Sequence, residues 1–264
     1  MSDGRKIWFR LRGESGTVPS MTRRSLLPWL VLLLGLTVPL ARAQSMEGKA
    51  TPAESHFVQP EAVDWKTLLP PPPAPGSIAA LGDVETVLQV QAARTPADVA
   101  WAKLIEQDKV FVDYGDVLGP WFEEKNLPAL AAFLADVTTD AKRVSDRMKD
   151  LYPRKRPPIV EPTVQPVVKI PTSNSYPSGH SLRAYVWAAV LGDVFPDRQA
   201  DLFTRAHKVA WGRVIGGVHF PTDTIGGRVA AQAIVAELRK SPAYRAEVEK
   251  CRAEVAPFLL RKAA

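Results

Sequence analysis

Residues 175–194 read SYPSGHSLRAYVWAAVLGDV, and this stretch joins a short polar turn to a long apolar segment. The apolar segment shows no two-residue alternation, so it predicts an apolar helix over about 179–194. Ser178 and Gly179 stand where that helix begins. Free backbone N–H groups at a helix start, together with the helix dipole, favour a bound anion. The stretch therefore predicts a helix whose first turn faces an anion.

Helical spacing of apolar residues continues on both sides of this stretch. We expect further helices over about Ile78–Gln91, Thr95–Lys109, Leu127–Leu151, 198–217 and 221–240, and a terminal helix after Ser241-Pro242. Residues 152–177 carry seven prolines and are expected to form a long loop, which in a compact domain is usually functional. Gly115–Pro120 is also expected to be a loop. Because no stretch alternates like a strand, the sequence predicts an all-α single domain, with Trp101, Trp187 and Trp211 in its core.

The basic excess of the chain lies near its beginning. The formal net charge is +6, and residues 1–43 hold seven basic and two acidic groups, so 44–264 keep only about +1. This balance gives no support for polyanion binding by the main domain, and no nucleic-acid partner is expected.

Residues 21–43, MTRRSLLPWLVLLLGLTVPLARA, have the charged, apolar and small-residue order of a signal peptide. Their apolar part spans about fifteen residues and contains prolines, so it is short for a membrane span. We expect cleavage near Ala43 and a chain that is periplasmic or secreted, without stable membrane insertion. Residues 1–20 are interpreted as an upstream extension before Met21, and Thr22-Arg23-Arg24 leaves twin-arginine export open.

The remaining chain divides in two. Residues 44–75 are expected to form a proline-rich extended arm, because proline runs are stiff and non-helical. Residues 76–264 are expected to form the helical domain. Cys251 is the only cysteine, which excludes a disulfide scaffold and favours a packed position on a helix.

Polar residues that carry chemistry gather in three blocks. The blocks are Lys149 with Arg156-Pro157, Pro177-Ser178-Gly179-His180, and Arg213 with His219 and Asp223. Three fixed cations suit a small, multiply charged anion such as phosphate. Gly179 lets the backbone approach that anion closely. Ser178 stands at the helix start, where free backbone N–H groups favour an anion.

The third block also predicts a nucleophile. Asp223 follows His219 by one helical turn, so its carboxylate can accept from one ring nitrogen and leave the other free. His180 is a second imidazole that can serve as acid and base. Two histidines in a group of cations predict a phosphoryl-transfer site.

These blocks resemble the signature of the type 2 phosphatidic acid phosphatase superfamily, K-x6-RP, PSGH and SR-x5-H-x3-D. Within it, the signal peptide and three stretches resemble the class A bacterial non-specific acid phosphatases. The stretches are LLPPPPAPGSIA (68–79), SYPSGHS (175–181) and GRVIGGVHFPTD (212–223). One departure is Gly212, where the family usually has serine.

The resemblance implies the helical fold shared with vanadium-dependent haloperoxidases. It implies broad-specificity hydrolysis of phosphate monoesters: His219 forms a phosphohistidine and is oriented by Asp223, while His180 is the general acid and base. Phosphate would be held by Lys149, Arg156, Ser178, Gly179 and Arg213. No metal or other cofactor is expected. The resemblance leaves a homo-oligomer, a dimer or larger, open.

Three other functions stay open. The same site in a vanadium-dependent haloperoxidase binds vanadate through the residue equivalent to His219. A lipid phosphate phosphatase of the superfamily would act on isoprenyl or phosphatidyl phosphates. A phosphate-binding protein without turnover is the third.

Overall fold

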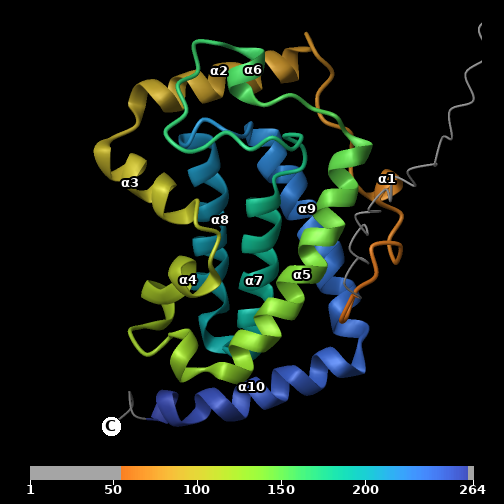
Figure 1. Cartoon of the computed structure of the whole chain (residues 1–264), viewed down its shortest axis with the longest axis vertical. Coiled ribbons are helices and arrows are strands. Elements are labelled where there is room, and N and C mark those ends of the chain that lie inside the picture. Colours follow the sequence, from red (N-terminus) through yellow and green to blue (C-terminus); the bar gives the residue numbers. More distant parts are fainter. Residues whose placement is uncertain (1–54, 261–264) are drawn as a thin grey trace, which may run out of the picture. The chain divides into compact units, whose positions relative to one another are not determined.

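The computed structural model describes residues 55–260, and the expected signal peptide and upstream extension lie outside them. Between residues 55 and 260 no residue lies in a β-strand, so the described part is all-α as expected. The helix α7 (Gly179–Val194) runs through the middle of the bundle (Figure 1). Thirteen of its sixteen residues are buried, because its apolar run faces a neighbour on every side.

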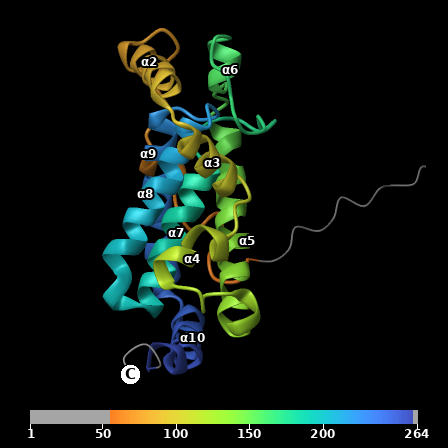
Figure 2. The same cartoon turned by 90° about the vertical axis from the view of Figure 1, so that its left-hand side faces the viewer.

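Three long helices surround α7. These are α5 (Pro128–Leu151), α8 (Gln199–Ile215) and α9 (Pro221–Lys240). The last long helix, α10 (Pro242–Leu260), crosses one end of the bundle, and Cys251 is buried in it. The opposite end carries α2 (Ile78–Ala93) and the short α6 (Pro157–Val160) (Figure 2). The site residues described below gather at this second end.

Two shorter helices, α3 (Pro96–Ile105) and α4 (Val110–Leu118), lie along α8. Here the sequence-based expectation was wrong in two places. The helix expected to reach Lys109 ends at Ile105, and Asp108 turns the chain with a φ of 55°. The loop expected at Gly115–Pro120 is mostly helix, because burial of Tyr114 and Leu118 holds the helix through Gly115.

Residues 55–75 belong to the same compact unit as the helices. The four-residue helix α1 (Trp65–Leu68) interrupts this expected arm. The buried side chains of Trp65 and Leu69 join the main core. The backbone carbonyls of Leu69 and Pro70 accept hydrogen bonds from Tyr152 (2.8 Å) and Tyr176 (2.6 Å). The proline-rich segment is therefore tied to the loop between α5 and α7.

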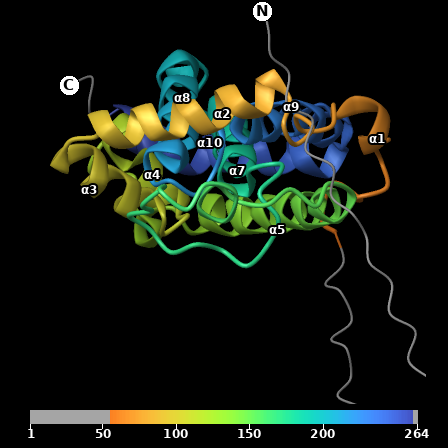
Figure 3. The same ribbon diagram turned by 90° about the horizontal axis from the view of Figure 1, so that it is seen from above.

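That loop, residues 152–178, passes over the end of α7 between α2 and α5, as the view from above shows (Figure 3). This loop contains α6. The short 3-10 turns η1 (Glu124–Asn126) and η2 (Pro196–Arg198) lie elsewhere, η1 before α5 and η2 before α8. The loop brings Arg154, Arg156 and Ser175 to the same place as the starts of α7 and α9. The long proline-rich loop is thus a wall of the site.

Candidate active site

All three sequence blocks meet at the end of α7 that lies under α2. Lys149 lies in the last turn of α5, and Arg156 lies at the start of α6. The start of α7 provides Ser178, Gly179 and His180. Arg213 lies in the last turn of α8, and the start of α9 provides His219 and Asp223. All are buried except His180, whose side chain keeps 17% of its surface exposed.

The imidazole of His219 is held between a carboxylate and a guanidinium. Its Nδ1 lies 3.2 Å from Oδ2 of Asp223, and its Nε2 lies 3.2 Å from Nη1 of Arg156. Since the carboxylate only accepts and the guanidinium only donates, these partners assign the proton to Nδ1 and the lone pair to Nε2. Burial lowers the pKa of His219 to about 3, against the opposing effect of Asp223. Nε2 therefore stays unprotonated in acidic solution, with its lone pair facing Arg156.

Both oxygens of Asp223 are hydrogen-bonded. Oδ2 accepts from the Ser175 hydroxyl at 2.5 Å and from the backbone N–H of Phe220 at 2.9 Å, and Oδ1 accepts from Arg154 at 2.6 Å. Although burial raises the pKa of Asp223, the groups that favour its anion, His219 first, bring the net pKa below its ordinary value. Asp223 is therefore a fixed carboxylate facing His219.

Sequence reasoning missed Arg154 and gave Ser175 no role. A signal was present, because Arg154 and Arg156 are two apart in a non-helical segment and exposed Lys155 stands between them. In an extended backbone such residues share a face. Ser175 stands in the SYPSGHS stretch, three residues before the helix start.

Two of the expected cations are held by backbone carbonyls. Nζ of Lys149 donates to Asn174 (2.6 Å) and Pro177 (2.8 Å), while Nη1 of Arg156 donates to Val218 (2.8 Å). Burial lowers the pKa of Lys149 to about 7 and that of Arg156 to about 10. The two side chains are oriented by the loop and concentrate positive charge beside His219.

The third cation and the second histidine have free hydrogen-bonding atoms. Nε and Nη1 of Arg213 and Nε2 of His180 are buried and have no protein partner among the described residues. Burial is the first cause of the lowered pKa of His180, followed by the charges of Arg213 and Arg183. Buried polar atoms normally have partners, so this group of donors has the character of an anion site.

Two carboxyl groups lie on the α4 side of these residues. Oδ2 of Asp108 pairs with Arg183 and lies 4.0 Å from Nε2 of His180. Asp113 is fully buried, and neither of its oxygens has a hydrogen-bond partner in the part of the chain that the structure describes. Burial, with the charge of Asp108, raises the pKa of Asp113 to about 8. Asp113 is therefore neutral in acidic solution.

Packing against α3 explains why glycine stands at position 212. A Cβ built on it would lie 3.1 Å from Nε1 of Trp101 and 3.2 Å from two side-chain carbons of Ile105. Both residues belong to α3. The serine expected at this position would press against α3, and glycine lets α3 approach α8 closely.

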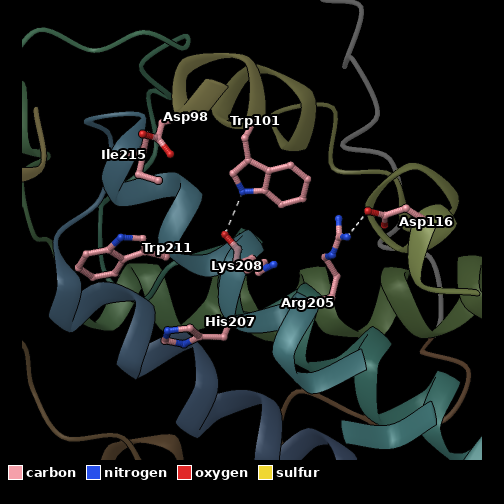
Figure 4. Close-up of a pocket in the computed structure, with 8 residues that line it drawn as sticks. All are labelled: Asp98, Trp101, Asp116, Arg205, His207, Lys208, Trp211 and Ile215. Atoms are coloured by element: carbon pink, nitrogen blue, oxygen red, sulfur yellow. Dashed lines mark hydrogen bonds and ion pairs between the residues drawn. The ribbon is translucent and has the colours of Figure 1, made fainter. Parts of the chain in front are cut away.

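A surface pocket of about 590 Å³ lies between α3, α4 and α8 and is separate from the motif residues (Figure 4). Two polar contacts are made among its lining residues. Arg205 pairs with Asp116 and lies over the ring of Trp101, whose Nε1 donates to the Lys208 carbonyl at 3.1 Å. Trp211 also lines it, and with 36% of its surface exposed it is not the core residue expected, whereas Trp187 is buried. The pocket takes no part in the site.

Within residues 55–260, no three His, Cys, Asp or Glu side chains are grouped closely enough to hold a metal ion. In the same residues no helix is both long and apolar enough to cross a membrane.

Residues 127–247 match the family model of the PAP2 superfamily. The chain is 28% identical to a non-specific acid phosphatase of Providencia stuartii over 74% of its own length and 82% of the relative. It is also 28% identical to a non-specific acid phosphatase of Salmonella typhimurium, over 78% and 87%. A solved transmembrane PAP2-type phosphatidylglycerolphosphate phosphatase of Bacillus subtilis aligns with a TM-score of 0.44 at 21% identity, over 62% of this chain and 89% of that one.

Proposed function

We propose that this protein is an acid phosphatase that hydrolyses phosphate monoesters with broad specificity, through a phosphohistidine and without a metal ion. The observation that carries the proposal is the arrangement around His219. A neutral imidazole, with Nδ1 held by Asp223, directs the lone pair of Nε2 toward a site lined by buried cations. The similarity to non-specific acid phosphatases supports the same reaction. We also propose export through the 21–43 signal peptide, which lies outside the described residues.

In the first step, Nε2 of His219 attacks phosphorus and the bond from phosphorus to the ester oxygen breaks. His180, protonated by the proton that the substrate monoanion brings into the site, gives that proton to the ester oxygen, and the alcohol leaves. In the second step, a water oxygen attacks phosphorus while His180 takes its proton. The bond from phosphorus to Nε2 breaks, and phosphate leaves with His219 restored.

The cations act on the charge that develops during both steps. Arg213 has two buried donors free for the phosphoryl oxygens, and Arg156 and Lys149 stand on the His219 side. The first turn of α7, which begins at Gly179 after the N-cap Ser178, adds the positive end of the helix dipole. Fixed donors of this kind stabilise a transition state without having to reorganise.

The test uses purified residues 44–264, p-nitrophenyl phosphate and a chelator at pH 5 to 6, with His219→Ala as the comparison. We expect turnover that survives the chelator and is lost in the variant. Turnover that persists in the variant would disprove the nucleophile, and turnover lost with the chelator would disprove metal independence. No wild-type turnover would disprove the function itself.

Vanadate separates the phosphatase from the haloperoxidase. Vanadate resembles the five-coordinate transition state, so we expect competitive inhibition of hydrolysis. A second assay supplies vanadate, halide and peroxide, and we expect no halide oxidation in it. Halide oxidation without phosphatase turnover would favour the haloperoxidase alternative.

A further inference from the structure

A buried ion-pair chain links α2 to the carboxylate that holds His219. Asp83 is 4% exposed and lies in the first half of α2. Its Oδ2 pairs with Nη2 of Arg154 at 2.7 Å, and Nη1 of Arg154 donates to Oδ1 of Asp223 at 2.6 Å. One guanidinium therefore bridges two carboxylates from different helices.

Arg154 also acts on the other oxygen of Asp223. Its backbone carbonyl accepts the N–H of Ser175 at 2.8 Å, and the Ser175 hydroxyl donates to Oδ2. Its guanidinium lies over the ring of Phe220, 4.2 Å from the centroid. Direct contact at Oδ1 and indirect contact at Oδ2 leave the carboxylate one orientation, the one that meets Nδ1 of His219.

Asp83 holds the start of α9 as well. Its Oδ1 accepts the backbone N–H of Thr222 at 3.1 Å, and its Oδ2 accepts the Thr222 hydroxyl. Thr222 precedes Asp223 and lies in the first turn of α9. The same carboxylate thus fixes both Arg154 and the backbone next to Asp223.

From these contacts we infer that Arg154 and Asp83 are positioning residues for the reaction, and that α2 acts on the site through them. The inference rests on the proposed function. It gives the segment from Leu68 to Ala79 a role, because that segment leads into α2. Within residues 55–260 neither side chain makes a hydrogen bond to His219 or to the groups proposed to bind phosphate, so their effect passes through Asp223.

The geometry predicts what loss of Arg154 does. Without its positive charge, Asp223 is less well oriented and attracts protons more strongly. The nearby His219 then becomes easier to protonate, so its pKa rises. We expect the acidic limb of the pH–rate profile to move to higher pH, and kcat to fall by about 10- to 100-fold, as for other residues that orient a reacting group. KM should change little, because the phosphate-binding groups are intact.

The structure also allows chemical rescue. An apolar groove of about 580 Å³ between the proline segment and α2 is lined by Arg154. In Arg154→Ala a guanidinium ion can enter from this groove and take the place of the lost side chain. We expect millimolar guanidinium chloride to restore part of kcat in Arg154→Ala, whereas sodium chloride at equal concentration restores none.

The experiment compares Arg154→Ala, Arg154→Lys and Asp83→Asn with wild type and with a matched control. The control is Arg239→Ala, which removes an arginine paired with Asp193 at 2.7 Å, on α9 and α7 away from the motif residues. We expect the control to keep wild-type kcat, and Asp83→Asn and Arg154→Lys to lose less than Arg154→Ala. Circular dichroism and affinity for inorganic phosphate show whether each variant folds and binds.

A second readout does not depend on turnover. Nitrogen-15 spectra of the imidazoles, assigned with His219→Ala, report the tautomer and pKa of His219. We expect a proton on Nδ1 in wild type, and a higher pKa in folded Arg154→Ala. An unchanged His219 pKa with unchanged kcat would overturn the inference, and so would a loss of kcat matched by loss of phosphate affinity. Failure of the proposed function looks different, because wild type would then show no turnover while the spectra still respond to Arg154.

Discussion

Single side chains at this site have protonation states that burial controls. His219 has a pKa near 3 and the pKa of His180 is also lowered, so both rings are neutral in mildly acidic solution when no anion is bound. In the proposed mechanism, neutral His219 is the form that attacks phosphorus. The first step also needs a proton for the leaving oxygen, and a substrate monoanion brings that proton into the site.

This leads to a prediction for pH dependence. The second proton of a phosphate monoester has a pKa of about 6, so the monoanion disappears as pH rises above that value. We expect kcat/KM to fall about tenfold per pH unit above roughly pH 6. Initial rates between pH 4 and 9 check this, and a flat profile into alkaline solution would contradict the need for a substrate proton in the first step.

His180 itself is tested through the leaving group. A p-nitrophenolate leaves without a proton more easily than an alkoxide does. We therefore expect His180→Gln to lower kcat/KM for glycerol phosphate at least tenfold more than for p-nitrophenyl phosphate, in keeping with the usual size of acid catalysis. Equal losses for the two substrates would assign the proton transfer to another group.

Asp113 provides a stability prediction at the same scale. Its folded pKa, about 8, lies above the ordinary 3.8, so its contribution to stability is present below pH 4 and is lost as pH rises toward 8. Asp113→Asn cannot ionise. We expect the unfolding free energy of the variant, relative to wild type, to rise by at least about 1 kcal/mol between pH 5 and 8. Urea unfolding at both pH values measures it, and a constant difference would mean that Asp113 ionises freely.

At the scale of elements, the close crossing of α7 and α9 sets the distance between the two histidines. A Cβ on Gly227 would lie 2.6 Å from the Ser178 carbonyl oxygen and 2.9 Å from Cβ of Ser181. These neighbours belong to the cap and first turn of α7 and do not move independently. The Ser178 N–H also donates to the Asp223 carbonyl at 2.9 Å. The crossing of α7 and α9 therefore fixes the site residues at the starts of these two helices relative to each other.

Gly227→Ala is therefore expected to lower stability by about 1–3 kcal/mol, as overpacking does, and to lower activity as well. The control is Gly115→Ala in α4, where a Cβ meets no atom within 4 Å. An alanine there is expected to stabilise by about 0.5–1 kcal/mol, because it reduces the freedom of the unfolded chain. Thermal unfolding of both variants tests these opposite changes in stability. A Gly227→Ala variant that is as stable as wild type would show that α7 and α9 can move apart without loss of stability.

At the scale of the whole molecule, α10 closes the core at the end opposite the site, and its contacts reach α5, α7 and α9. Cys251 on this helix has no exposed surface, and burial raises the pKa of its thiol to about 12. Both effects suppress reaction with a thiol reagent in the native state.

We expect Ellman's reagent to label Cys251 at pH 8 only when the fold opens, at a rate that increases with urea in parallel with unfolding. Labelling in high urea provides the upper limit. Rapid labelling without urea would show that α10 separates from the bundle on its own.

The sequence predicted most helices because their apolar spacing and their caps are local features. Ser178, Thr95 and the prolines that start α3, α5 and α9 act within a turn of where they stand. It did not predict α4 and placed a loop at Gly115–Pro120, because only tertiary burial of Tyr114 and Leu118 holds that helix. The short α1 was missed for the same reason, since Trp65 is buried by residues far along the chain.

The three blocks and the residues within them could be picked out from type and spacing alone, because together they combine the cations, imidazoles and carboxylate that a phosphoryl-transfer site is expected to need. Which residues hold those groups in place was not evident. Asp83 precedes Arg154 by 71 residues, and Arg154 precedes Asp223 by 69, so no local pattern connects them. The proton on Nδ1 of His219, its low pKa and the ion pairs behind Asp223 follow from burial and long-range packing, and only the tertiary structure decides them.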